Sequence, residues 1–422
     1  MKKMVSFGLV MFLCSYGYAA EPAALTLESL LEKADKENPQ IQAVRERYEA
    51  ARMRIPQAGA LDDPKFEFRY DTMTASMDAV MEGKTAPMRV FGLSQEVPFP
   101  TKLRLRGQIA AKEAQIAFTE VEEKENEITA RVKAVFSELA WIYTAIEVVG
   151  ENKILLEQLE KTTAARFSLN KVSQQDVLKA QLEIAKMNNE LIMFEEKRQV
   201  AQGKLNILIN NDPSEELGRP SVGNEGALSV PLAELNALAK SHRKELEAFR
   251  LAVERGKKTL SLAKQEYLPD FMFKYERMER DSRLTEWAGM VGVTIPLWFW
   301  QKQDFNVKAM DHELRSMEAM FRDKENEVLL EVKEFYSQLD AVGKLAELYR
   351  TAYLPQAEQS LKAALSGYEA AQTDFLNVLD SVRMLIEFKL DYYRTLIEFA
   401  VARADLERAV GKDFRVAERK EK

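Results

Sequence analysis

The sequence predicts a mainly α-helical protein that is internally duplicated and carries four short β-strands that contribute to a membrane β-barrel. Three observations lead to this fold class: apolar residues at coiled-coil spacing, two pairs of segments in which aromatic and charged residues alternate, and the recurrence of both features in each half of a 422-residue chain. Charged residues make up 30% of the chain and Gly and Pro are scarce, a composition that favours long helices. The net charge of −7 gives no indication of a nucleic-acid surface.

The N-terminus differs from the rest of the chain. Two lysines precede an apolar run, and small residues follow it up to Ala19. This pattern predicts a secretory signal peptide over residues 1–19. The single cysteine, Cys14, lies inside this segment, and its alternative role as a lipid anchor is disfavoured because Leu13 stands where a small residue is needed. No later apolar run reaches the roughly 18 residues that a membrane-spanning helix requires.

The chain contains an internal duplication. Three pairs of segments correspond in the same order: PKFEFRYD (64–71) with PDFMFKYE (269–276), VKAVFSEL (132–139) with VKEFYSQL (332–339), and DVLKA (176–180) with NVLDS (377–381). The interval between partners changes by a few residues only, which we attribute to loop insertions. The predicted parts are a first repeat (20–210), a linker containing Gly, Pro and Ser (211–231), a second repeat (232–411) and a charged tail (412–422).

Each repeat follows one plan of long helices. A helical stretch of about thirty residues (27–58 and 232–267) precedes a strand pair, a very long helix, a turn and a return helix. The first long helix, 103–169, would measure on the order of 100 Å. Apolar residues in it are separated alternately by four and three positions: Ile128, Val132, Val135, Leu139, Ile142, Ile146 and Val149. This period indicates helices packed along their length as in a coiled coil.

The strand pairs are expected near 64–71 with 88–97, and near 269–276 with 287–295. Alternation places six aromatic residues on one face and charged residues on the other: Phe66, Phe68, Tyr70, Phe271, Phe273 and Tyr275. Strands of this kind suit a tilted membrane crossing with the aromatic face toward lipid. Four strands cannot close a barrel, so chains would share one as a dimer or a trimer. Soluble hairpins capping a helical bundle are the alternative. Trp298 and Trp300, after the last strand, suit either a membrane interface or packing at the strand–helix junction.

The whole predicted mature chain resembles the TolC-like outer-membrane factor family. The residues that carry the resemblance are the duplicated strand pairs and four segments: SQEVPFPTKLRLRG (94–107), VGVTIPLW (291–298), LNKVSQQDVLKAQ (169–181) and AAQTDFLNVLDSV (370–382). The resemblance implies a homotrimer whose twelve strands form one barrel among outer-membrane lipid and whose helices form a periplasmic tunnel. It also implies two partners, a periplasmic adaptor and an inner-membrane transporter of the RND type, and no cofactor.

The same resemblance suggests where the channel would be gated and where the adaptor would dock. An acidic pair usually lies at the periplasmic aperture of these channels, and the matching positions are Asn377 and Asp380, with Asp176 at the corresponding place in the first repeat. The helical tips are the expected adaptor contacts: Asn170, Lys171, Val172, Ser173, Ala371, Gln372 and Thr373. Asn170 and Ala371 replace the usual glycines, and only Asn accepts a left-handed backbone well.

The transported substrate is predicted from two less specific features of the sequence. PFPTKL (98–103) is similar to a segment common in the heavy-metal branch of the family. A loop at 72–88 carries four methionines, whose thioethers suit Cu(I) or Ag(I): Met73, Met77, Met81 and Met88. Efflux of drugs or organic solutes and type I protein secretion are the alternatives. The sequence lacks the constellation of an enzyme, and the remaining protein classes are a periplasmic adaptor and a structural coiled coil.

Overall fold

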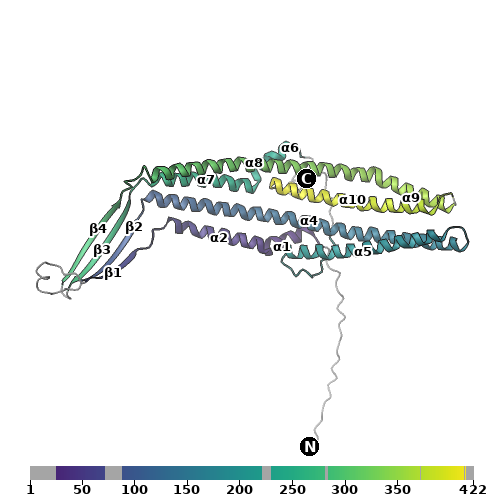
Figure 1. Ribbon diagram of the computed structural model, residues 1–422, viewed down its shortest axis with the longest axis horizontal. Helices are drawn as coiled ribbons and strands as arrows, with labels where there is room; N and C mark the ends of the chain where they lie inside the picture. The colour runs from purple at the N-terminus through teal and green to yellow at the C-terminus, as the bar shows by residue number, and fades with distance from the viewer. Residues whose placement is uncertain are drawn as a thin grey trace, which may run out of the picture.

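The computed structural model describes residues 25–71, 88–220, 230–280, 284–370, 372–412 and 414. Figure 1 shows a long, narrow molecule with a sheet at one end, two helical turns at the other, and helices along the whole length between them. The segment predicted to be a signal peptide (1–19), with Cys14, lies outside the described residues. No helix in the described ranges combines the length and the apolarity needed to cross a membrane.

The two repeats contain corresponding elements. The first has α1 (Leu27–Glu37), α2 (Pro39–Gly59), β1 (Lys65–Asp71), β2 (Met88–Val97), α4 (Pro100–Ser168) and α5 (Gln174–Leu208). The second has α6 (Leu232–His242), α7 (Lys244–Gln265), β3 (Asp270–Arg280), β4 (Leu284–Thr294), α8 (Gln303–Leu348), the π-helical turn η1 (Tyr349–Tyr353), α9 (Leu354–Glu369) and α10 (Phe375–Val410). The four strands and the long first helix therefore lie where the sequence predicts them.

The long helix α4 is the axis of the molecule. Its 69 residues give a length of about 100 Å. It begins at Pro100, whose fixed φ and missing N–H suit the first turn of a helix. Five of the seven residues predicted for its coiled-coil stripe are buried: Ile128, Val132, Leu139, Ile142 and Val149. Helices α2 and α5 pack along α4 on one side, and α7 and α10 pack along it on the other.

The helical stretch predicted over residues 27–58 is broken, and the break makes a joint between three helices. Asn38 separates α1 from α2, and its buried side chain accepts from the amide of Gln40 at 2.9 Å, which caps α2. The same side chain donates to the carbonyl oxygen of Leu208 at the end of α5 over 2.8 Å. Asn38 thus joins the beginning of α2 to the end of α5, and these two shorter helices together run along α4.

The stretch predicted over residues 232–267 is broken in the same way, but by a charged residue. Arg243 separates α6 from α7, and its guanidinium donates to the carbonyl oxygen of Arg408 in the last turn of α10. Its side chain is only 2% exposed. The second joint therefore repeats the link to the end of the return helix, with an arginine in place of an amide, but the side chain of Arg243 does not cap α7.

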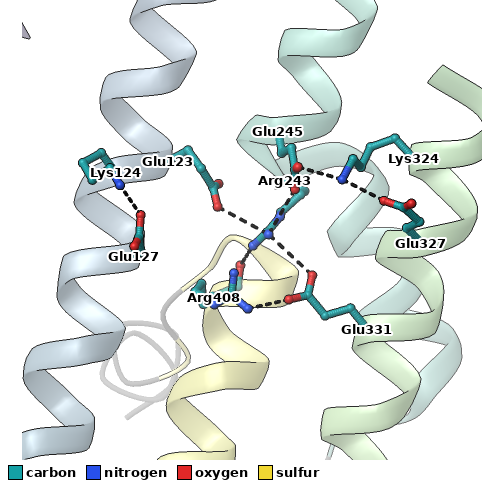
Figure 2. A network of polar contacts seen from close by, with 9 residues as sticks. All are labelled: Glu123, Lys124, Glu127, Arg243, Glu245, Lys324, Glu327, Glu331 and Arg408. Atoms are coloured by element: carbon teal, nitrogen blue, oxygen red, sulfur yellow. Dashed lines mark hydrogen bonds and ion pairs between the residues drawn. The ribbon is translucent and has the colours of Figure 1, made fainter. Parts of the chain in front are cut away.

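Three glutamates surround this buried guanidinium (Figure 2). Glu123, Glu245 and Glu331 lie 3.3, 3.3 and 3.5 Å from Arg243. They come from α4, α7 and α8, so the cluster links the two repeats as well as the ends of stacked helices. Pairing of this kind is required, because an unpaired charge in a protein interior costs several kcal/mol.

The second long helix contains a π-helical turn that we did not expect from the sequence. At Tyr349–Tyr353 the rod formed by α8 and α9 widens, and the amide of Leu354 donates to the carbonyl oxygen of Tyr349, five residues earlier. An α-helix bonds four residues back, so a π-turn holds one residue more. The corresponding part of α4 is regular α-helix.

This turn accounts for one change in the interval between the repeats. Leu139 corresponds to Leu339, whereas Arg166 corresponds to Gly367 at the tips, so the second repeat is one residue longer between these points. The extra residue lies within a helix and not in a loop, which corrects our attribution of the interval changes to loops. The π-turn absorbs it, so that Leu339 before the turn and Leu361 after it are both buried.

The hydrophobic core does not follow the repeat boundary. One cluster of buried residues combines α1, α4, α5 and the beginning of α2 from the first repeat with α9 and the first half of α10. A second, smaller cluster is formed by α6, the beginning of α7, α8 and the second half of α10. The π-turn lies where the chain leaves the second cluster and enters the first.

Candidate functional site

The six aromatic residues predicted to share a face do so. The strands pair antiparallel in chain order, and the register places Phe66 opposite Leu93, which in turn lies opposite Tyr275. Directly opposite residues of antiparallel strands point to the same side. Five of the six aromatic side chains are exposed, from 44% for Tyr275 to 70% for Phe66. The sheet therefore presents an apolar, aromatic surface to its surroundings.

The opposite face of the sheet is charged and internally paired. Lys274 lies 2.9 Å from Glu67 and 3.0 Å from Glu276, and Lys65 lies 2.9 Å from Glu96. A sheet with one apolar and one charged face suits a boundary between lipid and water.

Both outer strands of the sheet have an open edge. Within the described ranges β1 pairs only with β2, and β4 pairs only with β3. Unpaired backbone N–H and C=O groups are costly in an apolar environment. The isolated chain is consequently incomplete as a membrane element.

The first helical tip closes around Asn170. This residue has a φ of 55°, in the left-handed region that Asn accepts. The amide of Lys171 donates to the carbonyl oxygen of Arg166 over 3.0 Å, which is the closing bond of a Schellman turn. Asp176 then caps the next helix, because its carboxylate accepts from the backbone amide of Ser173 at 3.2 Å. Asn170, Lys171 and Ser173 are exposed, whereas Val172 and Asp176 are half-buried.

The second tip closes by an equivalent bond. The amide of Gln372 donates to the carbonyl oxygen of Gly367 over 2.8 Å. Ala371 lies outside the described residues, so the expected effect of its side chain on the turn stays a prediction. Gln372 is exposed and Thr373 is half-buried. In α10 the capping roles are exchanged relative to α5, since Asp374 accepts from the amide of Asn377 at 3.2 Å.

The three aperture candidates occupy different environments. Asp380 is exposed and lies 3.3 Å from Arg383, Asn377 lies at the beginning of α10, and Asp176 is engaged in the cap described above. Among the described residues, no hydrogen bond or ion pair joins these three side chains to one another. Asp380 is thus the candidate with a carboxylate that faces solvent.

Two contacts between the repeats near the tips were not found from the sequence. Arg383 pairs with the buried Glu183 of α5. Burial raises the pKa of Glu183, but hydrogen bonds from Arg383 and Lys186 outweigh it and lower the pKa overall. Arg166 donates to the carbonyl oxygen of Tyr368 over 2.7 Å, and its guanidinium lies 4.4 Å from the centre of that ring. The partners are far apart in the chain, so no local pattern indicates them.

The structure adds little to the metal candidates. Met73, Met77 and Met81 lie outside the described residues. Met88 is the first residue of β2 and pairs with Asp71 and Arg280 in the sheet register. Across the described ranges, no group of three or more His, Cys, Asp or Glu residues is arranged to hold a metal ion.

Comparison with known proteins identifies related chains. The profile of the outer membrane efflux protein family matches residues 30–211 and 235–412. The cobalt-zinc-cadmium resistance protein CzcC of Cupriavidus metallidurans is 23% identical over 397 residues, which cover 92% of this chain and 90% of that protein. The fold is similar to the outer membrane protein VceC of Vibrio cholerae, with a TM-score of 0.78, 18% identity and coverage of 92% and 96% of the two chains. It is also similar to CusC, with a TM-score of 0.80, 13% identity and coverage of 94% and 96%.

Proposed function

The chain belongs to the outer membrane efflux protein family, and from this premise we propose that it is the outer-membrane channel of a tripartite efflux system for heavy-metal cations. The observation that carries the channel assignment is the open-edged sheet with one aromatic face, mounted at one end of a helical rod about 100 Å long. The sheet would lie in the outer membrane and the rod in the periplasm. Family membership sets aside the periplasmic adaptor and the structural coiled coil.

The open edges support assembly of a homotrimer. If β4 of one chain pairs with β1 of the next, three chains give a closed barrel of twelve strands and leave no edge in hydrocarbon. The aromatic face would then contact outer-membrane lipid, and the charged face with Lys274 would line a water-filled lumen. The α-helices of three chains would continue this lumen as a tunnel.

Metal cations are the cargo that the relatives favour. The similar protein CzcC is named for resistance to cobalt, zinc and cadmium. The segment PFPTKL and the methionine loop point in the same direction, although residues 72–87 of the loop lie outside the described residues. Efflux of organic solutes or drugs, and protein secretion, are the competing cargoes.

The helical tips would meet the rest of the system. We assign the adaptor contacts to the residues around the two turns, of which Asn170, Lys171, Ser173 and Gln372 are exposed. An inner-membrane transporter of the RND type would supply the energy. Three copies of Asp380 would form an acidic ring at the aperture and favour cations. Asp176 and Asn377 would have a smaller part in this ring, because one caps a helix and the other is uncharged.

A deletion strain tests the function and the cargo together. We expect the protein to fractionate with the outer membrane, and its loss to sensitise cells to salts of Cu, Ag, Zn, Co or Cd but not to dyes and antibiotics. The intact gene should restore growth. Sensitivity to organic compounds alone would leave the channel in place but overturn the metal assignment, and release of the protein without detergent would overturn the channel.

The aperture assignment has a separate test. In planar bilayers, Asp380→Asn should lower the preference of the channel for cations over anions, because the ring loses its charge. Asp340→Asn is the matched control, since this carboxylate is also exposed and paired with a neighbouring lysine but lies on α8, far from the tips. Equal selectivity in the two variants would contradict the assignment of Asp380.

A further inference from the structure

The aromatic face of the sheet becomes charged at the end of the strands that lies away from the helices (Figure 1). Arg89 lies opposite Tyr70 on one side and Glu279 on the other, and Arg277 lies opposite Phe91 and Trp287. All of these residues therefore share the face that carries the aromatic residues. A charge on the lipid face of a barrel costs about 2–4 kcal/mol at the membrane centre and close to nothing at the interface.

The length of the strands places these charges at the membrane boundary. Strands β2, β3 and β4 have 10, 11 and 11 residues, the number that a tilted crossing requires, about 9–11. Arg89 is the second residue of β2, and Glu279 is the last but one of β3. Tyr70 and Trp287 beside them are of the type enriched at membrane interfaces. In the orientation proposed above, this boundary belongs to the outer leaflet.

The two arginines differ in how their charge is balanced. Arg277 lies 2.5 Å from Glu279, and its guanidinium stands 5.3 Å from the centre of the Trp287 ring. Arg89 is exposed and makes no ion pair with any residue that the structure describes. Glu279, the carboxylate opposite Arg89 in the register, is already paired with Arg277. The two arginines therefore share one described counter-charge on this face, and the guanidinium of Arg89 has no ion pair of its own there.

We propose that Arg89, with Arg277 beside it, binds a phosphate group of an anionic lipid in the outer leaflet. A guanidinium presents paired donors that match two phosphate oxygens, and such charge-assisted bonds are strengthened where water is scarce. The proposal rests on the proposed barrel, because only there does this face contact lipid. Arg89 lies on an inner strand, so its surroundings do not depend on pairing with a neighbouring chain.

The test measures binding of lipid A, a phosphorylated glycolipid, to the detergent-purified full-length protein by native mass spectrometry. We expect Arg89→Gln to raise the apparent Kd roughly tenfold, since one charge-assisted interaction is lost. Arg69→Gln is the matched control, because Arg69 precedes Tyr70 in β1 and lies on the opposite, charged face. It should leave the Kd unchanged. Arg89→Lys should bind with intermediate strength, because it keeps the charge and loses the paired donors.

Each result decides the proposal. Equal binding by wild type and Arg89→Gln, or equal weakening by Arg89→Gln and Arg69→Gln, would overturn it. Displacement of lipid A by inorganic phosphate at matched concentration would also overturn it, since the site would then recognise the free anion. Fractionation of the wild type separates these failures from failure of the proposed function: a protein that is absent from the outer membrane refutes the barrel itself.

Discussion

The buried arginine at the second joint allows a sharp test of what holds the rod together. Arg243→Met would remove the cation that forms an ion pair with Glu123, a carboxylate whose pKa is raised by burial, and would leave Arg408 as a more distant positive charge. It would also remove the donor that the carbonyl oxygen of Arg408 receives at the end of α10. The fold would keep a side chain of similar size there, so the change is mainly one of charge.

The expected cost follows from the burial. Removing one partner of a buried ion pair costs about 3–5 kcal/mol, because the other charge is left without compensation. The side chain of Arg243 is 2% exposed, and three carboxylates surround it, so the full range applies. At 1.4 kcal/mol per factor of ten, the joint should open roughly a hundredfold to a few thousandfold more often.

Hydrogen–deuterium exchange resolved by mass spectrometry measures this opening locally. Peptides from the α6–α7 junction and from the end of α10 should exchange faster, while peptides from the first joint around Asn38 should not change. Lys244→Met is the matched control. Lys244 is the next residue and pairs with Glu122 at 2.8 Å, but its side chain is 29% exposed. A pair with that exposure contributes about 1 kcal/mol or less, which corresponds to about fivefold faster exchange at most.

The reasoning would be refuted if Arg243→Met and Lys244→Met had similar effects. Similar effects would mean that the glutamates around Arg243 are solvated, and that packing alone holds α7 and α10 end to end. Faster exchange along the whole rod would instead mean that the joint has no local opening of its own.

Three further predictions concern other parts of the helical rod. Burial raises the pKa of Glu123, so this group adds stability below its ordinary pKa of 4.5, and that stability is lost as the pH rises through the raised pKa. Glu123→Gln should therefore make the melting temperature depend less on pH across that window, and an unchanged pH dependence of the melting temperature would refute this. Deleting Arg350 should convert the π-turn to α-helix and be tolerated. Deleting Arg322 should instead rotate the buried face of the helix after it by about 100° and block folding. Equal yields of folded protein from the two deletions would contradict the interpretation of the π-turn as a one-residue insertion. Asn170→Ala should destabilise the first tip by about 1–2 kcal/mol in urea unfolding, whereas Asn170→Gly should not, because φ is 55° there.

Much of the fold could be predicted because it is repeated in local patterns. Alternation fixed the two faces of the sheet, and the four-three spacing fixed the buried stripe of α4. The break at Asn38 also had a local signal, since Asn followed by Pro is typical of a helix beginning. The break at Arg243 had none, because that arginine acts through glutamates on three other helices.

The candidate site was predicted less completely, for two physical reasons. Ser173 followed three residues later by Asp176 is the spacing of a capping box, so the cap could have been expected from the sequence. Contacts such as Arg166 with Tyr368 and Glu183 with Arg383 join residues about two hundred positions apart, and no periodicity reports them. The π-turn was predictable only in part. The change in the interval between corresponding residues of the two repeats revealed the extra residue, but it did not show that this residue lies within a helix.

The two repeats of this sequence share a hydrophobic core, and the reason lies in the shape of the molecule. Single helices about 100 Å long cannot surround a core, so each repeat must bury its apolar stripe against the other. The larger core cluster accordingly mixes α4 and α5 with α9 and the beginning of α10. Duplication supplied two similar halves, and each half was then free to change where it meets the other. The joint of the first repeat uses the amide of Asn38 where the second uses Arg243, and α4 is a regular helix where the second repeat contains a π-turn. The arginine joint lies where the two repeats meet and the π-turn lies between the two cores, whereas the amide joint lies within the first repeat. We therefore expect asymmetry in the mechanics of the rod to arise at the joints and the π-turn and not at the strands.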